Sequence, residues 1–101
     1  MNAQLTEYWF FNMIKNRILL RQEIGDFLRS ARRSKSLTGI QLGKMLHISQ
    51  QQISRYERGE TSINIETLDI LLKVLDMDWS DFFFKVMANY STEIAEIKLY
   101  R

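Results

Sequence analysis

Hydrophobic residues recur at helical spacing along most of the chain. In residues 22–35, one face carries Ile24, Phe27, Leu28 and Ala31, which is the spacing of an amphipathic helix. Residues 5–20 are apolar on a broader surface and predict a second helix. The two helices could be continuous, because nothing between residues 20 and 24 would break them.

The middle of the chain contains a strong helix start signal. Thr38 is a good N-cap, and Gln41, three residues later, completes a capping box. These residues predict a short helix over residues 39–46. We expect its inward side chains to be Leu42, Met45 and Leu46.

A second short helix follows almost at once. The first helix must end near His47, because Ser49 offers a new N-cap with Gln52 three residues beyond it. This predicts a helix over residues 50–57. Two helices of about two turns joined by a tight corner describe a helix-turn-helix.

The second half of the chain predicts further helices. Asn64 precedes an apolar-periodic segment over 65–75, and Asp78 precedes another over 79–89, with Phe82, Phe83 and Val86 available for packing. Residues 90–101 are compatible with a last amphipathic helix or a short strand. The chain has no proline and only four glycines, which suits a helical fold. We therefore expect an all-α fold.

Composition limits the classes of function. The 101 residues suffice for one domain. There is no cysteine and one histidine, His47, so we expect no metal site. No nucleophile set or phosphate loop indicates an enzyme, and we expect neither a cofactor nor a small-molecule substrate. The most apolar stretch, residues 8–11, is far short of the roughly 20 residues of a membrane span, so a cytoplasmic, nucleoid-associated protein is expected.

Charge is unevenly distributed. Residues 1–63 hold ten Lys or Arg against five Asp or Glu, whereas residues 64–101 hold four against seven. A basic first part and an acidic end suggest that only one face meets a polyanion.

Some sixty residues, from about 24 to 83, resemble the XRE (Cro and phage-repressor type) family of helix-turn-helix proteins. The resemblance is carried by LTGIQLGKMLHISQQQISRYERGE at 37–60 and by SINIETLDILLKVLDMDWSDFF after it. The matching positions are Thr38, Leu42, Leu46, Ile48, Ser49, Ile53, Ser54, Arg55, Glu57, Arg58 and Gly59. Within the family, SQQQISRYERG is similar to the MrpJ-type regulators associated with fimbrial operons.

The resemblance implies a five-helix, lambda-repressor-like domain over residues 22–89. The chain would add an N-terminal helical extension, 1–20, and a short C-terminal extension, 90–101. Three positions depart from the family pattern. Gly39 replaces a glutamine that typically braces the reading helix against a phosphate, His47 replaces the turn glycine, and Ile63 replaces a proline. His47 would need a positive φ, which His tolerates better than most residues.

The resemblance also implies a partner, double-stranded DNA, read in the major groove by the second helix of the motif. Gln50, Gln51 and Arg55 are the candidate base-reading residues, because glutamine can pair with adenine and arginine with guanine. Gln52 is a fourth base-reading candidate, but it faces more sideways, and the alternative is that it contacts only phosphate or sugar. The alternatives are glutamines that are merely solvated and an Arg55 that contacts phosphate.

Further residues are candidates for contacts with the DNA backbone. Arg32 matches a family arginine that pairs with Glu57 while facing a phosphate. Ser49 opens a helix N-terminus, a natural seat for phosphate. The full set of candidates is Thr38, Arg32, Ser49, Arg58, Thr61 and Ser62.

The expected function is sequence-specific transcription regulation, as a repressor, with fimbrial or motility genes as targets implied by the resemblance. A homodimer on a pseudo-palindromic operator is expected, since one short helix reads too few base pairs. The aromatic flanks around Trp9 and Trp79 could wrap the domain or form that interface, and the sequence does not assign the interface to one end. The alternative is an antitoxin or another partner-binding protein with the same fold.

Overall fold

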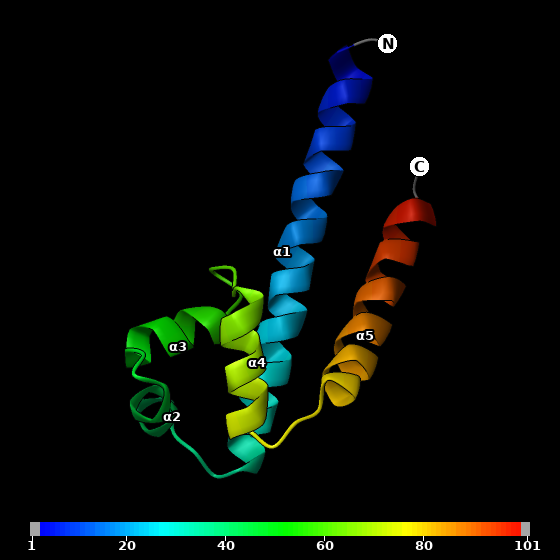
Figure 1. The fold of residues 1–101 in the computed structure, drawn as a ribbon. Helices are drawn as coiled ribbons and strands as arrows, with labels where there is room; N and C mark the ends of the chain where they lie inside the picture. The colour runs from blue at the N-terminus through cyan, green and yellow to red at the C-terminus, as the bar shows by residue number, and fades with distance from the viewer. Residues whose placement is uncertain (1–2, 100–101) are drawn as a thin grey trace.

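The computed structural model describes the backbone of residues 3–99 and the side chains of residues 7–92. Within that range the chain is entirely helical, without strands, which confirms the expected all-α class. The helices, shown in Figure 1, are α1 (Ala3–Ser34), α2 (Gly39–Leu46), α3 (Gln50–Glu57), α4 (Ile65–Val74) and α5 (Trp79–Leu99).

The two terminal helices are longer than the sequence pattern alone defined. The helices predicted over 5–20 and 22–35 form one continuous helix, α1. The helix predicted over 79–89 continues to Leu99, so residues 90–99 adopt the helical alternative rather than a strand. Tyr100 and Arg101, and the side chains of the flank residues Ile94 and Ile97, lie outside the described part of the chain.

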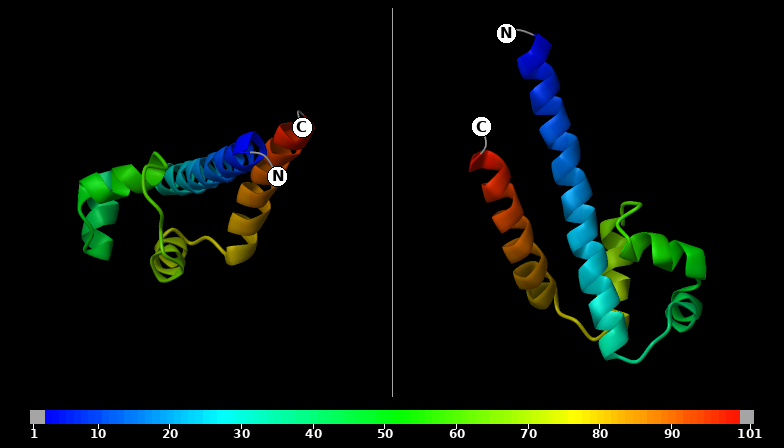
Figure 2. Two further views of the ribbon diagram at one scale, coloured as in Figure 1. Left: turned by 90° about the horizontal axis from the view of Figure 1, so that it is seen from above. Right: turned by 180° about the vertical axis from the view of Figure 1, so that it is seen from behind.

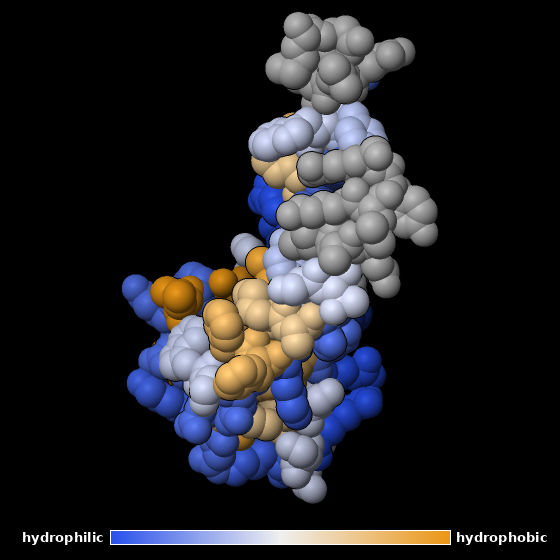
Figure 3. Space-filling view, turned by 90° about the vertical axis from the view of Figure 1, so that its right-hand side faces the viewer, coloured by the Kyte–Doolittle hydropathy of each residue, from blue (hydrophilic) through white to orange (hydrophobic). Residues whose placement is uncertain are grey.

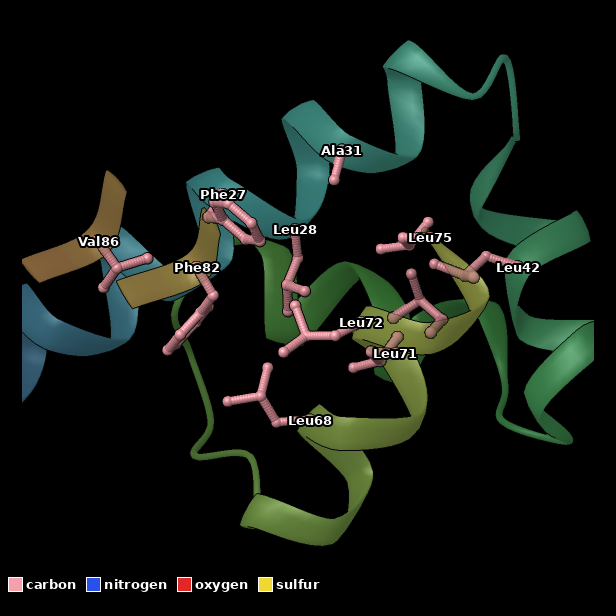
Figure 4. Close-up of a cluster of buried hydrophobic side chains, with 11 residues drawn as sticks. Phe27, Leu28, Ala31, Leu42, Leu68, Leu71, Leu72, Leu75, Phe82 and Val86 are labelled. Atoms are coloured by element: carbon pink, nitrogen blue, oxygen red, sulfur yellow. The ribbon is translucent and has the colours of Figure 1, made fainter. Parts of the chain in front are cut away.

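The core lies where the lower half of α1 meets α3, α4 and the start of α5 (Figures 1 and 4). The face of α1 predicted to be apolar supplies Phe27, Leu28 and Ala31, and Ile24 packs against them. Phe27 meets Phe82 of α5 edge to face, with ring centroids 5.4 Å apart. The remaining buried side chains are Leu42, Ile53, Leu68, Leu71, Leu72, Leu75 and Val86.

Two side chains that were expected to pack inward are exposed. On α2 the buried positions are Leu42 and Gly43. Successive residues of a helix are rotated by about 100° around its axis, so Met45 points well away from the direction midway between these two. Met45 is accordingly exposed. Phe83 directly follows the buried Phe82, and this single step turns its ring out of the core to 61% exposure.

The molecule is elongated because α1 and α5 extend together beyond the body (Figure 2). Its radius of gyration is 15.8 Å and its extents are 51 × 25 × 20 Å, whereas a compact domain of this length would have a radius of gyration of about 13 Å. Viewed from the side of α5, apolar surface gathers over the body (Figure 3). None of the helices within residues 3–99 combines the length and the hydropathy of a membrane span.

Candidate nucleic-acid interface

The corner between α2 and α3 is built by local hydrogen bonds. The Thr38 Oγ1 atom accepts from the Gln41 backbone N–H at 3.1 Å, and the Gln41 Oε1 atom accepts from the Thr38 N–H at 2.8 Å, so the predicted capping box is confirmed. α2 ends at His47, which has a left-handed backbone with φ 56°. His47 therefore takes the conformation that glycine usually supplies at a helix C-terminus.

α3 starts at the predicted N-cap. The Ser49 Oγ atom accepts from the Gln52 backbone N–H at 3.1 Å. The corner is tight, because a Cβ atom added to Gly43 would lie 2.5 Å from the Ile48 carbonyl oxygen. Ile53 is buried and anchors α3 to the core. These contacts fix the direction in which the first residues of α3 point.

The C-terminal end of α3 rests on α1 at Gly25. A Cβ atom at this position would lie 2.4 Å from the Glu57 carbonyl oxygen and 2.6 Å from that of Tyr56, so only glycine allows this approach. Because α3 meets α1 at its last residues, its first residues point away from α1 (Figure 1). The family motif does not point to Gly25; a glycine inside an otherwise helical pattern was the available signal.

An ion pair between Arg32 and Glu57 holds α3 against α1. The Arg32 Nε and Nη2 atoms donate to the two carboxylate oxygens of Glu57 at 2.6 and 2.9 Å, and Nη1 donates to the Leu37 carbonyl at 2.7 Å. The hydrogen bond to Glu57 raises the pKa of Arg32, and burial opposes this effect. The pair implied by the resemblance is therefore present. It leaves fewer N–H groups of Arg32 free for a phosphate than an exposed arginine would have.

The outer side of α3 presents the predicted reading residues. Gln50, Gln51 and Arg55 are exposed and line an open hollow together with Ser54, Arg58 and Glu60. Gln52 is half-buried, in keeping with its predicted sideways orientation. Ser54 was not among the candidate site residues, yet it lines the same hollow, about one helical turn after Gln50 and Gln51.

The loop after α3 carries the remaining candidates. Arg58 is exposed and pairs with Glu60, its Nε atom 3.0 Å from Oε1 and its Nη2 atom 3.1 Å from Oε2. A phosphate would have to compete with this carboxylate for Arg58. Thr61 is half-buried and Ser62 is exposed. Gly59 turns the loop with φ +70° and lies directly against Gln22 of α1.

No cluster of three or more histidine, cysteine or acidic side chains suited to a metal ion occurs within the described residues. The side chains gathered at α3 are amides, hydroxyls and guanidinium groups. They are hydrogen-bonding groups for a polar or anionic surface.

Comparison with known proteins agrees with this geometry. A family model described as helix-turn-helix matches residues 28–82. A solved structure of the clp gene regulator ClgR from Corynebacterium glutamicum has a TM-score of 0.69 and 27% identity, and covers 81% of this chain and 87% of that one. A second structure of that regulator has a TM-score of 0.64 and 28% identity, covering 68% and 88%.

Among curated proteins, the antitoxin PezA of Streptococcus pneumoniae serotype 4 (strain ATCC BAA-334 / TIGR4) is 31% identical over 58 residues. The match includes 57% of this chain but only 37% of the length of that antitoxin. The matching helix-turn-helix model spans more than half of the chain and contains the corner, the outer side of α3 and most of the core residues. The chain therefore belongs to the helix-turn-helix family of the XRE type.

Proposed function

We propose that this protein is a DNA-binding transcription regulator that reads base edges in the major groove with α3. The observation that carries the proposal is the outward row of Gln50, Gln51 and Arg55 on a helix whose other end is fixed to α1. The family membership and the likeness to the ClgR regulator support it.

The chemistry of the row suits sequence readout. A glutamine amide can pair bidentately with adenine N6 and N7, and an arginine with guanine O6 and N7. Ser49 and Thr38 each use the hydroxyl oxygen to accept a backbone N–H, so each hydroxyl proton remains available for a phosphate oxygen. Gln52, Arg32, Arg58, Thr61 and Ser62 complete the proposed contact set, mainly at the DNA backbone.

The test is a selection of bound DNA sequences with the wild-type chain and with Gln51→Ala. We expect the variant to lose preference at one base position in each half-site, by about 1–3 kcal/mol. Ser91→Ala, an exposed change on α5, is the control and should leave the preference intact. If Gln51→Ala weakened binding uniformly on all DNA sequences, Gln51 would contact the DNA backbone rather than a base. The absence of any sequence preference in the wild type would refute the proposal.

The finer proposal is a homodimeric repressor on a pseudo-palindromic operator, with two α3 helices in successive major grooves about 34 Å apart. Control of fimbrial or motility genes is proposed from the resemblance of SQQQISRYERG to MrpJ-type regulators. Sequencing of the DNA bound by the chain in its own cells would test the target genes.

A second candidate function is that of an antitoxin, which the match to PezA favours. The discriminating experiment expresses the product of each gene next to this one, alone and together with the chain. Growth arrest relieved by both the wild type and Gln51→Ala would support an antitoxin that acts by protein contact. If none of the neighbouring gene products arrested growth, the antitoxin would be ruled out and the transcription regulator would remain.

A further inference from the structure

Residues 36–62, which form α2, α3 and the adjoining loops, carry one exposed carboxylate, Glu60. The other acidic residue of this stretch, Glu57, is the largely buried partner of Arg32. The exposed cations of the same stretch are Lys44, Arg55 and Arg58. Glu60 is therefore an exposed negative charge on a surface whose other exposed side chains, within these residues, are neutral or positive.

The backbone fixes Glu60 at the edge of the hollow beside α3. Its N–H donates to the Arg55 carbonyl at 3.0 Å, and Gly59, with φ +70°, turns the chain just before it. Glu60 lines the hollow together with the proposed reading residues Gln50, Gln51 and Arg55. A DNA strand that reached these reading residues would therefore bring its phosphates close to Glu60.

The carboxylate of Glu60 faces Arg58, one of the proposed contacts to the DNA backbone. The Arg58 Nε atom lies 3.0 Å from Oε1, and Nη2 lies 3.1 Å from Oε2. The carboxylate thus occupies the edge of the guanidinium group that binds a phosphate in the same two-point manner. The two side chains are 57 and 50% exposed, and an ion pair this exposed is weak. A phosphate could therefore take the place of the carboxylate.

Both arrangements of Arg58 give the same net charge at the DNA backbone. If Arg58 stays with Glu60, the phosphate meets a neutral pair. If Arg58 turns to the phosphate, the carboxylate of Glu60 is left unpaired beside a polyanion, which is unfavourable. The electrostatic part of DNA binding depends on the phosphates that the protein neutralises and on the counterions released there. The pair adds little to this part in either arrangement.

We propose that Glu60 attenuates DNA binding by cancelling the charge of Arg58 at the DNA backbone. This inference rests on the proposed function and concerns its sequence-independent part, because phosphate contacts position a protein on DNA without selecting a sequence. Glu60 thus lowers the affinity for every DNA sequence. It leaves the base contacts of α3 a larger share of the binding free energy.

The test measures how the affinity for unrelated duplex DNA falls with salt concentration, in the wild type and in variants of Glu60. The logarithm of the binding constant falls with the logarithm of the salt concentration, with a slope of about −0.9 for each neutralised phosphate. Glu60→Gln should therefore steepen the slope by about 0.9, and Glu60→Lys, which adds a further positive charge, by about 1.8. At about 0.15 M salt, Glu60→Gln should bind about 3- to 10-fold more tightly. Equal slopes for the wild type and Glu60→Gln would overturn the proposal.

Asp26→Asn is the matched control, because it makes the same change of net charge at an exposed position. Asp26 lies away from the hollow, in a pocket of α1 that Lys85 of α5 also lines, and its loss should leave the slope unchanged. An equally steepened slope would show that only the net charge of the chain matters. Combining Glu60→Gln with Arg58→Gln should return the slope to that of the wild type. A slope that stayed steep in this double variant would show that Glu60 does not act through Arg58.

A selection of bound DNA sequences separates this inference from the proposed function. Glu60→Gln should select the same sequences as the wild type. A changed preference at one base position would make Glu60 a base-reading residue, since a carboxylate can accept from the cytosine amino group, and would overturn its role as an attenuator. A wild type without sequence preference would refute the proposed function, while the salt slopes would still decide the role of Glu60. A wild type that bound no DNA at any salt concentration would overturn both.

Discussion

The ion pair between Arg32 and Glu57 is the residue-level contact that holds α3 against α1. The two side chains are only 13 and 9% exposed, so Glu57→Ala would leave a largely buried guanidinium without its main partner. We expect a loss of about 2–4 kcal/mol in the free energy of unfolding, measured by urea denaturation.

The exposed pair of Lys73 and Asp69 is the matched control for this prediction. Lys73 is 75% exposed, and Lys73→Ala should change the free energy of unfolding by no more than about 0.5 kcal/mol. Equal losses in the two variants would show that the buried pair has no special role in stability.

At the same scale, the sequence predicts residues whose role is local better than residues whose role depends on a distant neighbour. His47 was predicted to be a turn residue, because the caps on both sides leave it no other place, and its positive φ confirms this. Gly25 was missed, because its role depends on the carbonyl groups of a helix some thirty residues away.

At the scale of elements, helix boundaries were predictable where capping residues define them. The predicted spans 39–46 and 50–57 coincide with α2 and α3, since Thr38 and Ser49 bond to backbone groups within their own helices. The continuity of α1 across residues 20–24 and the extension of α5 beyond residue 89 stayed open in the sequence, because no glycine, proline or cap marks a helix end or its absence there. The reading contacts themselves remain predictions.

The first turn of α2 offers a gain-of-function prediction. A Cβ atom on Gly39 would lie 3.7 Å from the Gln50 Cγ atom and 3.9 Å from the Ile53 Cγ2 atom, which are ordinary contacts. Gly39→Ala should therefore stabilise the protein by up to about 1 kcal/mol. Gly39→Gln introduces the amide that the family resemblance implies at this position. If α3 binds DNA as proposed, this variant should also tighten binding on all DNA sequences by about 2- to 13-fold, which corresponds to the roughly 0.5–1.5 kcal/mol of one hydrogen bond.

Gel-shift titrations of both variants on one operator and on unrelated DNA would separate the two effects. Gly39→Ala is the control, because it changes helix propensity without adding a phosphate contact. If Gly39→Ala tightened binding as much as Gly39→Gln, the gain would come from a better-ordered helix rather than from the amide.

The whole molecule divides into a body with its own core and a projecting half of α1. The buried side chains of α1 begin at Phe27, with Leu20 and Ile24 packed against them, whereas Phe10 and Phe11 expose most of their surface. The sequence raised the question of what covers the aromatic flank, and the long-range arrangement of α1, α3 and α5 was needed to show which side of the helix is open.

Removal of residues 1–17 should therefore leave the body folded. We expect it also to abolish the proposed homodimer, because the removed segment carries the exposed rings of Phe10 and Phe11. The stability of the full chain, as a dimer, should rise with protein concentration by mass action, whereas that of the shortened chain should not change. Urea midpoints at two concentrations tenfold apart measure the difference. A shortened chain that no longer unfolds cooperatively would show instead that the projecting half of α1 belongs to the core of the body. A urea midpoint that depends on concentration in both proteins would place the association on another part of the chain.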